Sequence, residues 1–152
     1  MTMSGSGEET KTTTAERLRP KLLNPLTLAF FGDSVYEQLV REHIVFCHQS
    51  LSPNRLHFLA SGLVCASAQS RAYEILEPLL TEDELSILKR GRNANGVTPP
   101  KNAKTSDYRR ATGVEALFGF LHLSGDRDRI RELFERIIES TEETSLETED
   151  IR

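Results

Sequence analysis

The feature that most constrains the fold is a long apolar segment over residues 25–46, in which Pro25 is followed by LTLAFFGDSVYEQLVREHIVF. Asn24 suits the N-cap position of a helix, and Pro25 then falls at the first helical position, where its missing N–H leaves no bond unmade. The apolar residues repeat at helical spacing in two stripes, one made of Leu28, Phe31, Val35 and Leu39 and another that begins with Leu26, Ala29 and Phe30. We therefore predict a helix that is apolar on nearly all sides and forms the centre of the core.

The rest of the chain also has the pattern of helices separated by clear stops. Further helices are predicted to begin at Ser52-Pro53, Ala66, Thr81, Thr105 or Ser106, and Asp126. Residues 81–84 (TEDE) form a capping box, and Pro78 and Gly125 each stand where a helix should end. The longest internal loop, residues 93–104 (NANGVTPPKNAK), is rich in Gly, Pro and Asn. No segment has the pattern of a strand, so the predicted fold class is all-α.

The chain fits one globular domain, with 152 residues of which 38% are hydrophobic. Residues 1–18 lack apolar periodicity, and residues 139–152 carry six acids against one arginine. We predict that both segments are disordered and flank a domain at 19–138. No apolar stretch approaches the ~20 residues that span a bilayer, and no signal or transit peptide is evident, which favours the cytoplasm. Cys47 and Cys65 lack metal-binding spacing and are expected to be buried free thiols.

The charge of the chain is distributed unevenly. The net charge is −4, but residues 85–110 carry seven basic side chains and one acid, so this segment is +6 and the remainder is −10. A phosphate backbone responds to the local field of a patch, so an acidic chain can still bind RNA. The candidate RNA-binding residues are Lys89, Arg90, Arg92, Lys101, Lys104, Arg109 and Arg110. The alternative for the first three is a solvated helix end, favoured by the helix dipole.

Two acids, Asp33 and Glu115, lie within the two most apolar helical segments. Carboxylates are rarely placed in such surroundings unless they are paired or bind metal. Each has glycines nearby: Gly32 on one segment, Gly113 and Gly119 on the other. A glycine inside a helix costs about 0.5–1 kcal/mol relative to alanine, and close approach of two backbones commonly explains it. Two helices that cross near these glycines would bring Asp33 and Glu115 face to face.

Two ionised carboxylates at short range repel each other unless a cation lies between them. Oxygen ligands that leave positions free for water and phosphate suit Mg²⁺. The alternative is that Asp33 and Glu115 each pair with an arginine at the edge of the core. Glu37 lies one turn after Asp33 on the same face, where it can hold an outer-shell water or pair with Arg41.

Three segments resemble a known family. LNPLTLAFFGDSVYEQLVREHI resembles the ribonuclease III signature, a Gly-Asp-x-Val core on a buried helix, and YRRATGVEALFGFLHL resembles the second metal-binding helix of that family. KRGRNA, followed by TPPKNAKTSDYRRATGVEALFGFL, is similar to the Mini-ribonuclease III branch. Together these segments cover about residues 22–138. The resemblance implies a helical bundle like the ribonuclease III endonuclease domain, with Asp33 and Glu115 as the catalytic acids that bind Mg²⁺.

The chain departs from full-length ribonuclease III at positions that the Mini branch shares. Leu26 and Ala29 stand where the larger enzymes carry glutamates, and Thr112 stands where they carry an aspartate. No double-stranded-RNA-binding domain follows Ile138. Fewer carboxylates favour one well-bound Mg²⁺ over a firmly held two-metal centre. Thr112 and Glu37 remain possible outer-shell residues.

The resemblance also implies an activity and its partners. We expect a homodimer that cleaves double-stranded RNA, each subunit cutting one strand to leave a 5′-phosphate and a 3′-hydroxyl, with a large-subunit (23S-type) ribosomal RNA precursor as substrate. Phe30 and Phe31 are candidates for the dimer interface. Two alternatives stay open: a non-catalytic scaffold that binds double-stranded RNA, and a helical interaction domain whose basic segment meets an acidic partner protein.

Overall fold

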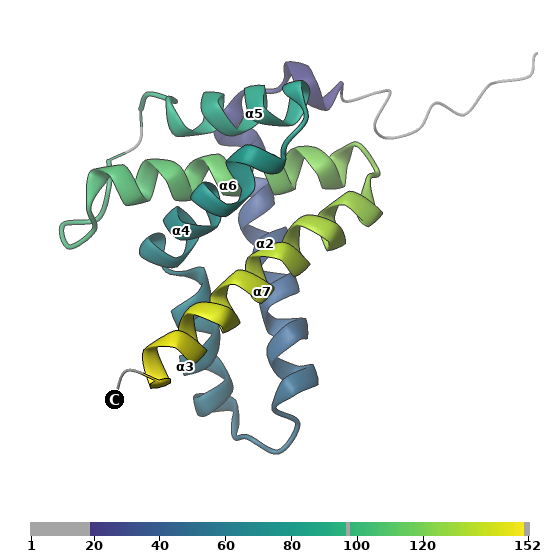
Figure 1. The fold of residues 1–152 in the computed structure, drawn as a ribbon. Coiled ribbons are helices and arrows are strands. Elements are labelled where there is room, and N and C mark those ends of the chain that lie inside the picture. The colour runs from purple at the N-terminus through teal and green to yellow at the C-terminus, as the bar shows by residue number, and fades with distance from the viewer. Residues whose placement is uncertain (1–18, 97, 151–152) are drawn as a thin grey trace, which may run out of the picture.

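The computed structural model describes residues 19–96 and 98–150, with side chains described as far as Glu142. Helices are the regular structure of these residues, and no strand occurs among them, which confirms the all-α prediction. The elements are η1 (Pro20–Leu22), α2 (Pro25–Cys47), α3 (Pro53–Val64), α4 (Ala66–Leu76), η2 (Glu77–Leu79), α5 (Glu82–Arg92), α6 (Thr105–Leu123) and α7 (Arg127–Asp150) (Figure 1). The predicted disorder of residues 1–18 lies outside the described residues.

The starts of three helices follow from local hydrogen bonding. The side chains of Asn24, Ser52 and Thr81 accept hydrogen bonds from backbone N–H groups in the first turns of α2, α3 and α5, at 2.9, 3.4 and 3.3 Å. Glu84 completes the predicted capping box, since its Oε1 accepts a hydrogen bond from the Thr81 N–H at 2.9 Å. These caps satisfy N–H groups that have no partner inside a helix.

Helix α6 begins at Thr105, as predicted, but neither Thr105 nor Ser106 caps it as the sequence suggested, because the N-cap is Lys104, which gives no side-chain cap. Residues 139–152 were expected to be disordered, and α7 continues through this segment to Asp150. Glutamate favours helix even without a tertiary partner, and the Thr141 Oγ1 donates to the Ile137 carbonyl at 2.8 Å, within the last turns whose side chains are described.

The cysteines also correct an expectation. Cys47 and Cys65 are free, as expected, but both are exposed rather than buried. Cys47 is the last residue of α2, and Cys65 joins α3 to α4. Both therefore lie where an apolar segment reaches the surface.

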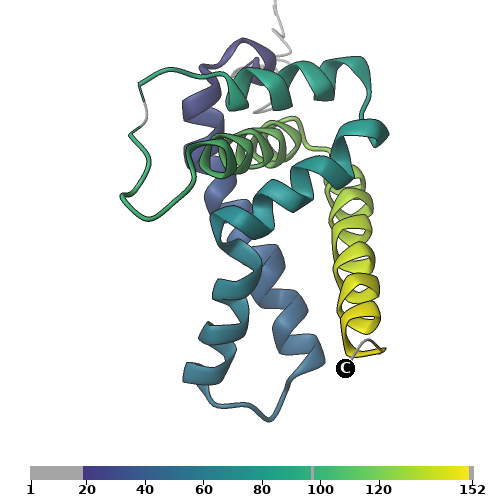
Figure 2. The same ribbon diagram turned by 60° about the vertical axis from the view of Figure 1, so that its left-hand side comes forward.

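Helix α6 lies at the centre of the molecule and contacts α2, α4, α5 and α7 (Figure 1). Helices α2 and α3 form a hairpin that extends away from α5, and α7 runs beside it (Figure 2). One side of α2 is left uncovered, with Phe30 84% and Phe46 72% exposed. The central position predicted for α2 therefore belongs to α6, and α2 carries an exposed apolar face.

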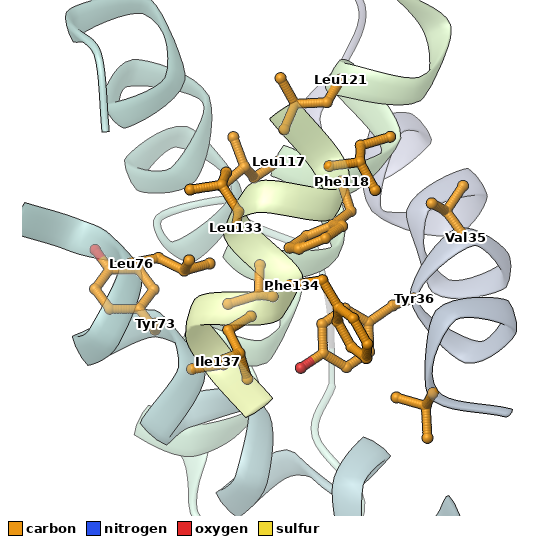
Figure 3. Close-up of a cluster of buried hydrophobic side chains, with 14 of the residues drawn as sticks. Val35, Tyr36, Tyr73, Leu76, Leu117, Phe118, Leu121, Leu133, Phe134 and Ile137 are labelled. Carbon is orange, nitrogen blue, oxygen red and sulfur yellow. The ribbon is translucent and has the colours of Figure 1, made fainter. Parts of the chain in front are cut away.

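The core is fixed by aromatic and aliphatic side chains of α2, α4, α6 and α7 (Figure 3). Tyr36 of α2 is 2% exposed, and its ring meets the Phe118 and Phe134 rings edge to face at centroid distances of 5.2 and 6.0 Å. Burial of a large apolar side chain contributes about 1.5–3 kcal/mol. These contacts hold α2 against α6 at Tyr36, which lies three residues after Asp33.

Candidate active site

The site begins at the crossing of α2 and α6, where two glycines allow the backbones to touch. A side-chain carbon on Gly32 would overlap the carbonyl oxygen of Glu115, and one on Gly119 would overlap the carbonyl oxygen of Leu28. Only glycine fits at either position, which confirms the predicted crossing. The crossing places Asp33, the next residue of α2, beside Glu115 of α6.

A second glycine contact joins α6 to α5. A side-chain carbon on Gly91 would lie 2.8 Å from the Gly113 Cα, and one on Gly113 would lie 2.6 Å from the Leu88 carbonyl oxygen. Gly113 therefore serves the packing of α5 rather than the crossing with α2. We did not anticipate Gly91 from the sequence, although a glycine inside the predicted helix 81–92 was a signal for such a contact.

The two acids differ in their surroundings. Burial raises the pKa of Glu115 to about 8, with a further increase from the negative charge of Asp33, and a hydrogen bond from the Gln69 side chain acts in the opposite direction. Asp33 is exposed, although partial desolvation and the charge of Glu37 raise its pKa. The apolar neighbours of Asp33 along the chain point to other sides of α2, so the burial that the sequence suggested applies only to Glu115.

The alternative in which each acid pairs with an arginine is not supported. Among the described residues, neither Asp33 nor Glu115 forms an ion pair. The nearby Glu37 does, since its Oε1 lies 3.0 Å from both the Nε and the Nη2 of Arg41. The carboxylates of Asp33 and Glu115 therefore act on each other without a neutralising side chain.

Gln69 of α4 is a polar member of the site that the sequence reasoning missed. Its side chain is 3% exposed, the Nε2 donates to the Val64 carbonyl at 3.0 Å, and the Oε1 has no partner among the described residues. Gln69 lies one turn before Ala72, a residue of the inward face of α4. A polar residue on the inward face of a predicted helix was the signal from which Gln69 could have been identified.

A cavity of about 350 Å³ opens beside Glu115 and Gln69. Its remaining lining comes from the end of α3, from α4 and α6, and from the loop of residues 93–104, namely Val64, Ala66, Pro100, Ala103, Tyr108, Ala111 and Thr112. Thr112 lines the cavity, and its hydroxyl donates to the Tyr108 carbonyl at 3.0 Å, which leaves the hydroxyl oxygen free to accept a hydrogen bond. The basic loop thus reaches the cavity that contains Glu115.

Three of the seven predicted RNA-binding residues are engaged within the protein. Arg90 donates to the carbonyls of Lys21 and Leu23, at 3.1 and 3.4 Å, and so ties α5 to η1. Arg92 donates to the Tyr73 hydroxyl at 2.8 Å. These contacts hold Arg90 and Arg92 against other parts of the protein, which neither the RNA-binding prediction nor the solvated helix end anticipated.

Arg110 is held in a similar way. Its Nη1 lies 2.7 Å from the Oε1 of Glu74, and its guanidinium carbon lies 5.7 Å from the centre of the Tyr73 ring. Arg92 lies 5.6 Å from the same ring centre, so two cations flank one tyrosine. The other four basic residues are exposed and form no ion pair among the described residues: Lys89, Lys101, Lys104 and Arg109.

The oxygen atoms of Asp33, Glu115 and Gln69 are the donors that could hold a cation. The described residues contain no cluster of three or more His, Cys, Asp or Glu side chains of the kind that forms an all-protein metal cage. Mg²⁺ retains several waters and needs only one or two carboxylates from the protein. The donor set therefore fits Mg²⁺ better than a cation that requires many side-chain ligands.

Comparisons with known proteins identify the family of the chain. The family model for the ribonuclease III domain matches residues 26–126. A protein named Mini-ribonuclease 3 from Brevibacillus brevis is 46% identical over 117 residues, which cover 77% of this chain and 87% of the relative. Another of the same name from Thermoanaerobacter is 38% identical over 141 residues, covering 93% and 97%. A crystal structure of a Fusobacterium nucleatum protein has a TM-score of 0.70 at 26% identity and covers 78% of this chain and 93% of that one.

The fold, the paired acids and the family match define a helical endoribonuclease. The chain belongs to the ribonuclease III family, and its relatives place it in the Mini-ribonuclease 3 branch. None of the helices within the described residues has the length and apolar character needed to cross a membrane.

Proposed function

We propose that the chain is a Mg²⁺-dependent endoribonuclease that cleaves double-stranded RNA, with Asp33 and Glu115 as its metal-binding catalytic acids. The observation that carries the proposal is the contact of Gly32 with the Glu115 backbone, which brings two carboxylates together without a neutralising side chain. Such a pair is stabilised by a bound cation, because the cation offsets both the repulsion and the desolvation that raise the pKa of Glu115.

The residues of the site would have different roles in metal binding, according to their surroundings. When bound, Mg²⁺ supplies an acidified water and a positive charge for the phosphate. Glu115, partly buried at a rigid helix crossing, fixes the ion relative to the protein. Asp33 is exposed and so can hold the ion where the RNA backbone reaches it. Thr112 and Glu37 are proposed as outer-shell residues, although Glu37 already pairs with Arg41.

The RNA-binding surface is proposed to consist of Lys89, Lys101, Lys104 and Arg109. These side chains are exposed, and Lys101 and Lys104 flank the loop residue Ala103 that lines the cavity next to Glu115. Arg90, Arg92 and Arg110 were also predicted to belong to this surface, and we propose that they support it instead, because they form contacts within the protein. Duplex RNA is recognised mainly by shape and by its backbone, which suits a small set of exposed cations.

We further propose that the enzyme is a homodimer that uses the exposed face of α2. Phe30, Ser34, Arg41 and Val45 follow one another at helical spacing on this face, and a groove of about 630 Å³ lies beside it. Phe31 is assigned to the monomer instead, because it packs on the core and its ring lies 5.3 Å from the His122 ring. A second copy on this face would place two Asp33 side chains toward one duplex, one for each strand.

The proposed substrate is a large-subunit (23S-type) ribosomal RNA precursor, as the resemblance to the Mini-ribonuclease III branch implies, and the proposed location is the cytoplasm. The first test is incubation of purified protein with labelled duplex RNA, with Mg²⁺ and with EDTA. Cleavage only with Mg²⁺ supports the proposal. Binding without cleavage under both conditions would instead support the non-catalytic scaffold, and no binding would support the interaction domain.

A further inference from the structure

We propose that Gln69 is a positioning residue of the metal centre, whose side-chain oxygen accepts a hydrogen bond from a water that the ion holds beside Glu115. The inference rests on the proposed function, because it assumes that a divalent cation binds at Asp33 and Glu115. It adds a residue from a third helix, α4, to a site otherwise built on α2 and α6.

The first observation is an acceptor that is buried without a partner. Gln69 is 3% exposed, and its Oε1 makes no hydrogen bond among the described residues. Nearly all buried polar atoms in folded proteins have a partner, because desolvation without a hydrogen bond is unfavourable. Gln69 and Glu115 line the same cavity, so a ligand of Glu115 lies in a space that Gln69 borders.

The second observation is that the orientation of the Gln69 amide is determined. The Nε2 donates to the Val64 carbonyl at 3.0 Å, and a reversed amide would place two oxygens against each other there. The amide nitrogen also forms the hydrogen bond that lowers the pKa of Glu115. Because the amide nitrogen already interacts with Val64 and Glu115, only the amide oxygen remains free to accept a hydrogen bond.

The chemistry of the site favours a neutral acceptor at this position. Asp33 and Glu115 already raise each other's electrostatic energy, and a third carboxylate would add to the repulsion. An amide oxygen can orient a metal-bound water without adding charge. Partners of this outer-shell kind commonly change metal affinity 10–100-fold when they are removed, an order-of-magnitude expectation.

The experiment measures Mn²⁺ binding to the metal-free full-length protein by electron paramagnetic resonance, with Mg²⁺ as competitor and without RNA. Gln69→Leu keeps the size of the side chain and removes both polar atoms, whereas Gln69→Glu restores an acceptor but cannot donate to Val64. Gln49→Leu is the matched control, because Gln49 is exposed in the connection between α2 and α3. We expect about 10-fold or greater loss of affinity in Gln69→Leu, partial recovery in Gln69→Glu, because its acceptor also brings a third negative charge, and no change in Gln49→Leu.

A merely structural role through Val64 gives a different pattern. Both Gln69 variants would then melt at a lower temperature, and both would bind Mn²⁺ as the wild type does, which would overturn the proposal. If Gln69→Leu does not fold, the wild-type protein decides the question through the side-chain carbonyl ¹³C resonance of Gln69. A shift on saturation with Mg²⁺ larger than that of Gln49 supports the hydrogen bond, and an unmoved resonance excludes it.

Failure of this inference is separable from failure of the proposed function. If the wild-type protein binds neither Mn²⁺ nor Mg²⁺, the metal-dependent function itself is wrong. If the wild type binds Mn²⁺ and Gln69→Leu binds it equally well, only the role of Gln69 is wrong.

Discussion

The backbone of Gly32 lies directly against the carbonyl group of Glu115, so closely that no side-chain carbon fits between the two helices. The contact places Asp33, one of the two proposed catalytic acids, next in sequence to the residue that touches Glu115, the other. Because the spacing of the carboxylates depends on a glycine and not on flexible side chains, the site is built into the packing of α2 on α6. The proposed activity should therefore be sensitive to changes that leave both acids in place.

Gly32→Ala should destabilise the protein and abolish cleavage together. The added carbon forces α2 away from α6, and overpacking of this kind costs about 1–3 kcal/mol or more. Gly62→Ala is the matched control, because a carbon there meets nothing within 4 Å. It should keep full activity and raise the free energy of unfolding by about 0.5–1 kcal/mol, since alanine favours helix over glycine. Urea denaturation and an RNA cleavage assay check both variants, and wild-type behaviour of Gly32→Ala would contradict the tight crossing.

Asp33→Asn should abolish cleavage while the fold and the affinity for RNA stay nearly unchanged. The amide is almost isosteric with the carboxylate but lacks the negative charge that binds a cation, and the exposure of Asp33 limits any effect on stability. Single-turnover cleavage, thermal melting and a gel-shift titration measure the three properties. Retention of more than a few per cent of the wild-type rate would remove Asp33 from the catalytic centre.

The stability of the metal-free protein should fall as the pH rises from about 5 to 8. The pKa of Glu115 is about 8 in the folded state against a usual 4.5, so the folded state holds a proton that the unfolded state has lost. Protonation of Glu115 stabilises the folded state fully below the unfolded pKa, and this stabilisation is lost as the pH rises through the folded pKa. It amounts to about 1.4 kcal/mol for each unit by which the two pKa values differ. Urea denaturation in EDTA at several pH values tests this.

Glu115→Gln provides the control for that titration. The glutamine cannot ionise, so the decline in stability over the same pH range should be much smaller, and the melting temperature at pH 8 should exceed that of the wild type. Equal slopes for the two proteins would show that Glu115 titrates at an ordinary pKa in the folded state.

Lys101→Ala/Lys104→Ala should weaken binding to duplex RNA of any sequence and flatten its dependence on salt. Each lost phosphate contact lowers the slope of log affinity against log salt by about one unit on a DNA-like lattice. The double variant Arg131→Ala/Arg136→Ala, with both positions exposed on α7, is the control for a general loss of charge. A second measurement is whether duplex RNA protects the loop from protease. An unchanged salt slope for the loop variant together with no protection would exclude the loop from the binding surface.

Phe30→Lys should convert a dimer into a monomer without lowering the stability of the subunit. Phe30 is 84% exposed, so the substitution removes little from the core. Phe58→Lys, at a residue of α3 that is 77% exposed, should leave the dimer intact and serves as the control. Sedimentation velocity at micromolar concentration distinguishes these results. A wild-type monomer that cuts both strands would contradict the use of α2 as an interface.

Much of this structure follows from local sequence. The caps at Asn24, Ser52 and Thr81, and the turn at Gly125, which has a φ of +78°, each depend on residues within a few positions of one another. Such short-range interactions can be recognised in a linear chain. The crossing at Gly32 was also predictable, because glycine in an apolar helix and an acid beside it imply a close neighbour.

The sequence determined the helices, the two acids and the glycine that joins them, because these depend on side-chain periodicity and on chemistry that each residue carries with it. Only the tertiary structure decided which helix touches which. It paired Gly113 with Gly91, brought Gln69 to Glu115, and engaged Arg110 with Glu74. These partners lie 22 to 46 residues apart in the chain, and packing, rather than periodicity, selects them from many candidates of the same type. For the same reason, charge counting could identify a basic segment but could not separate the arginines that form contacts inside the protein from the lysines that stay exposed.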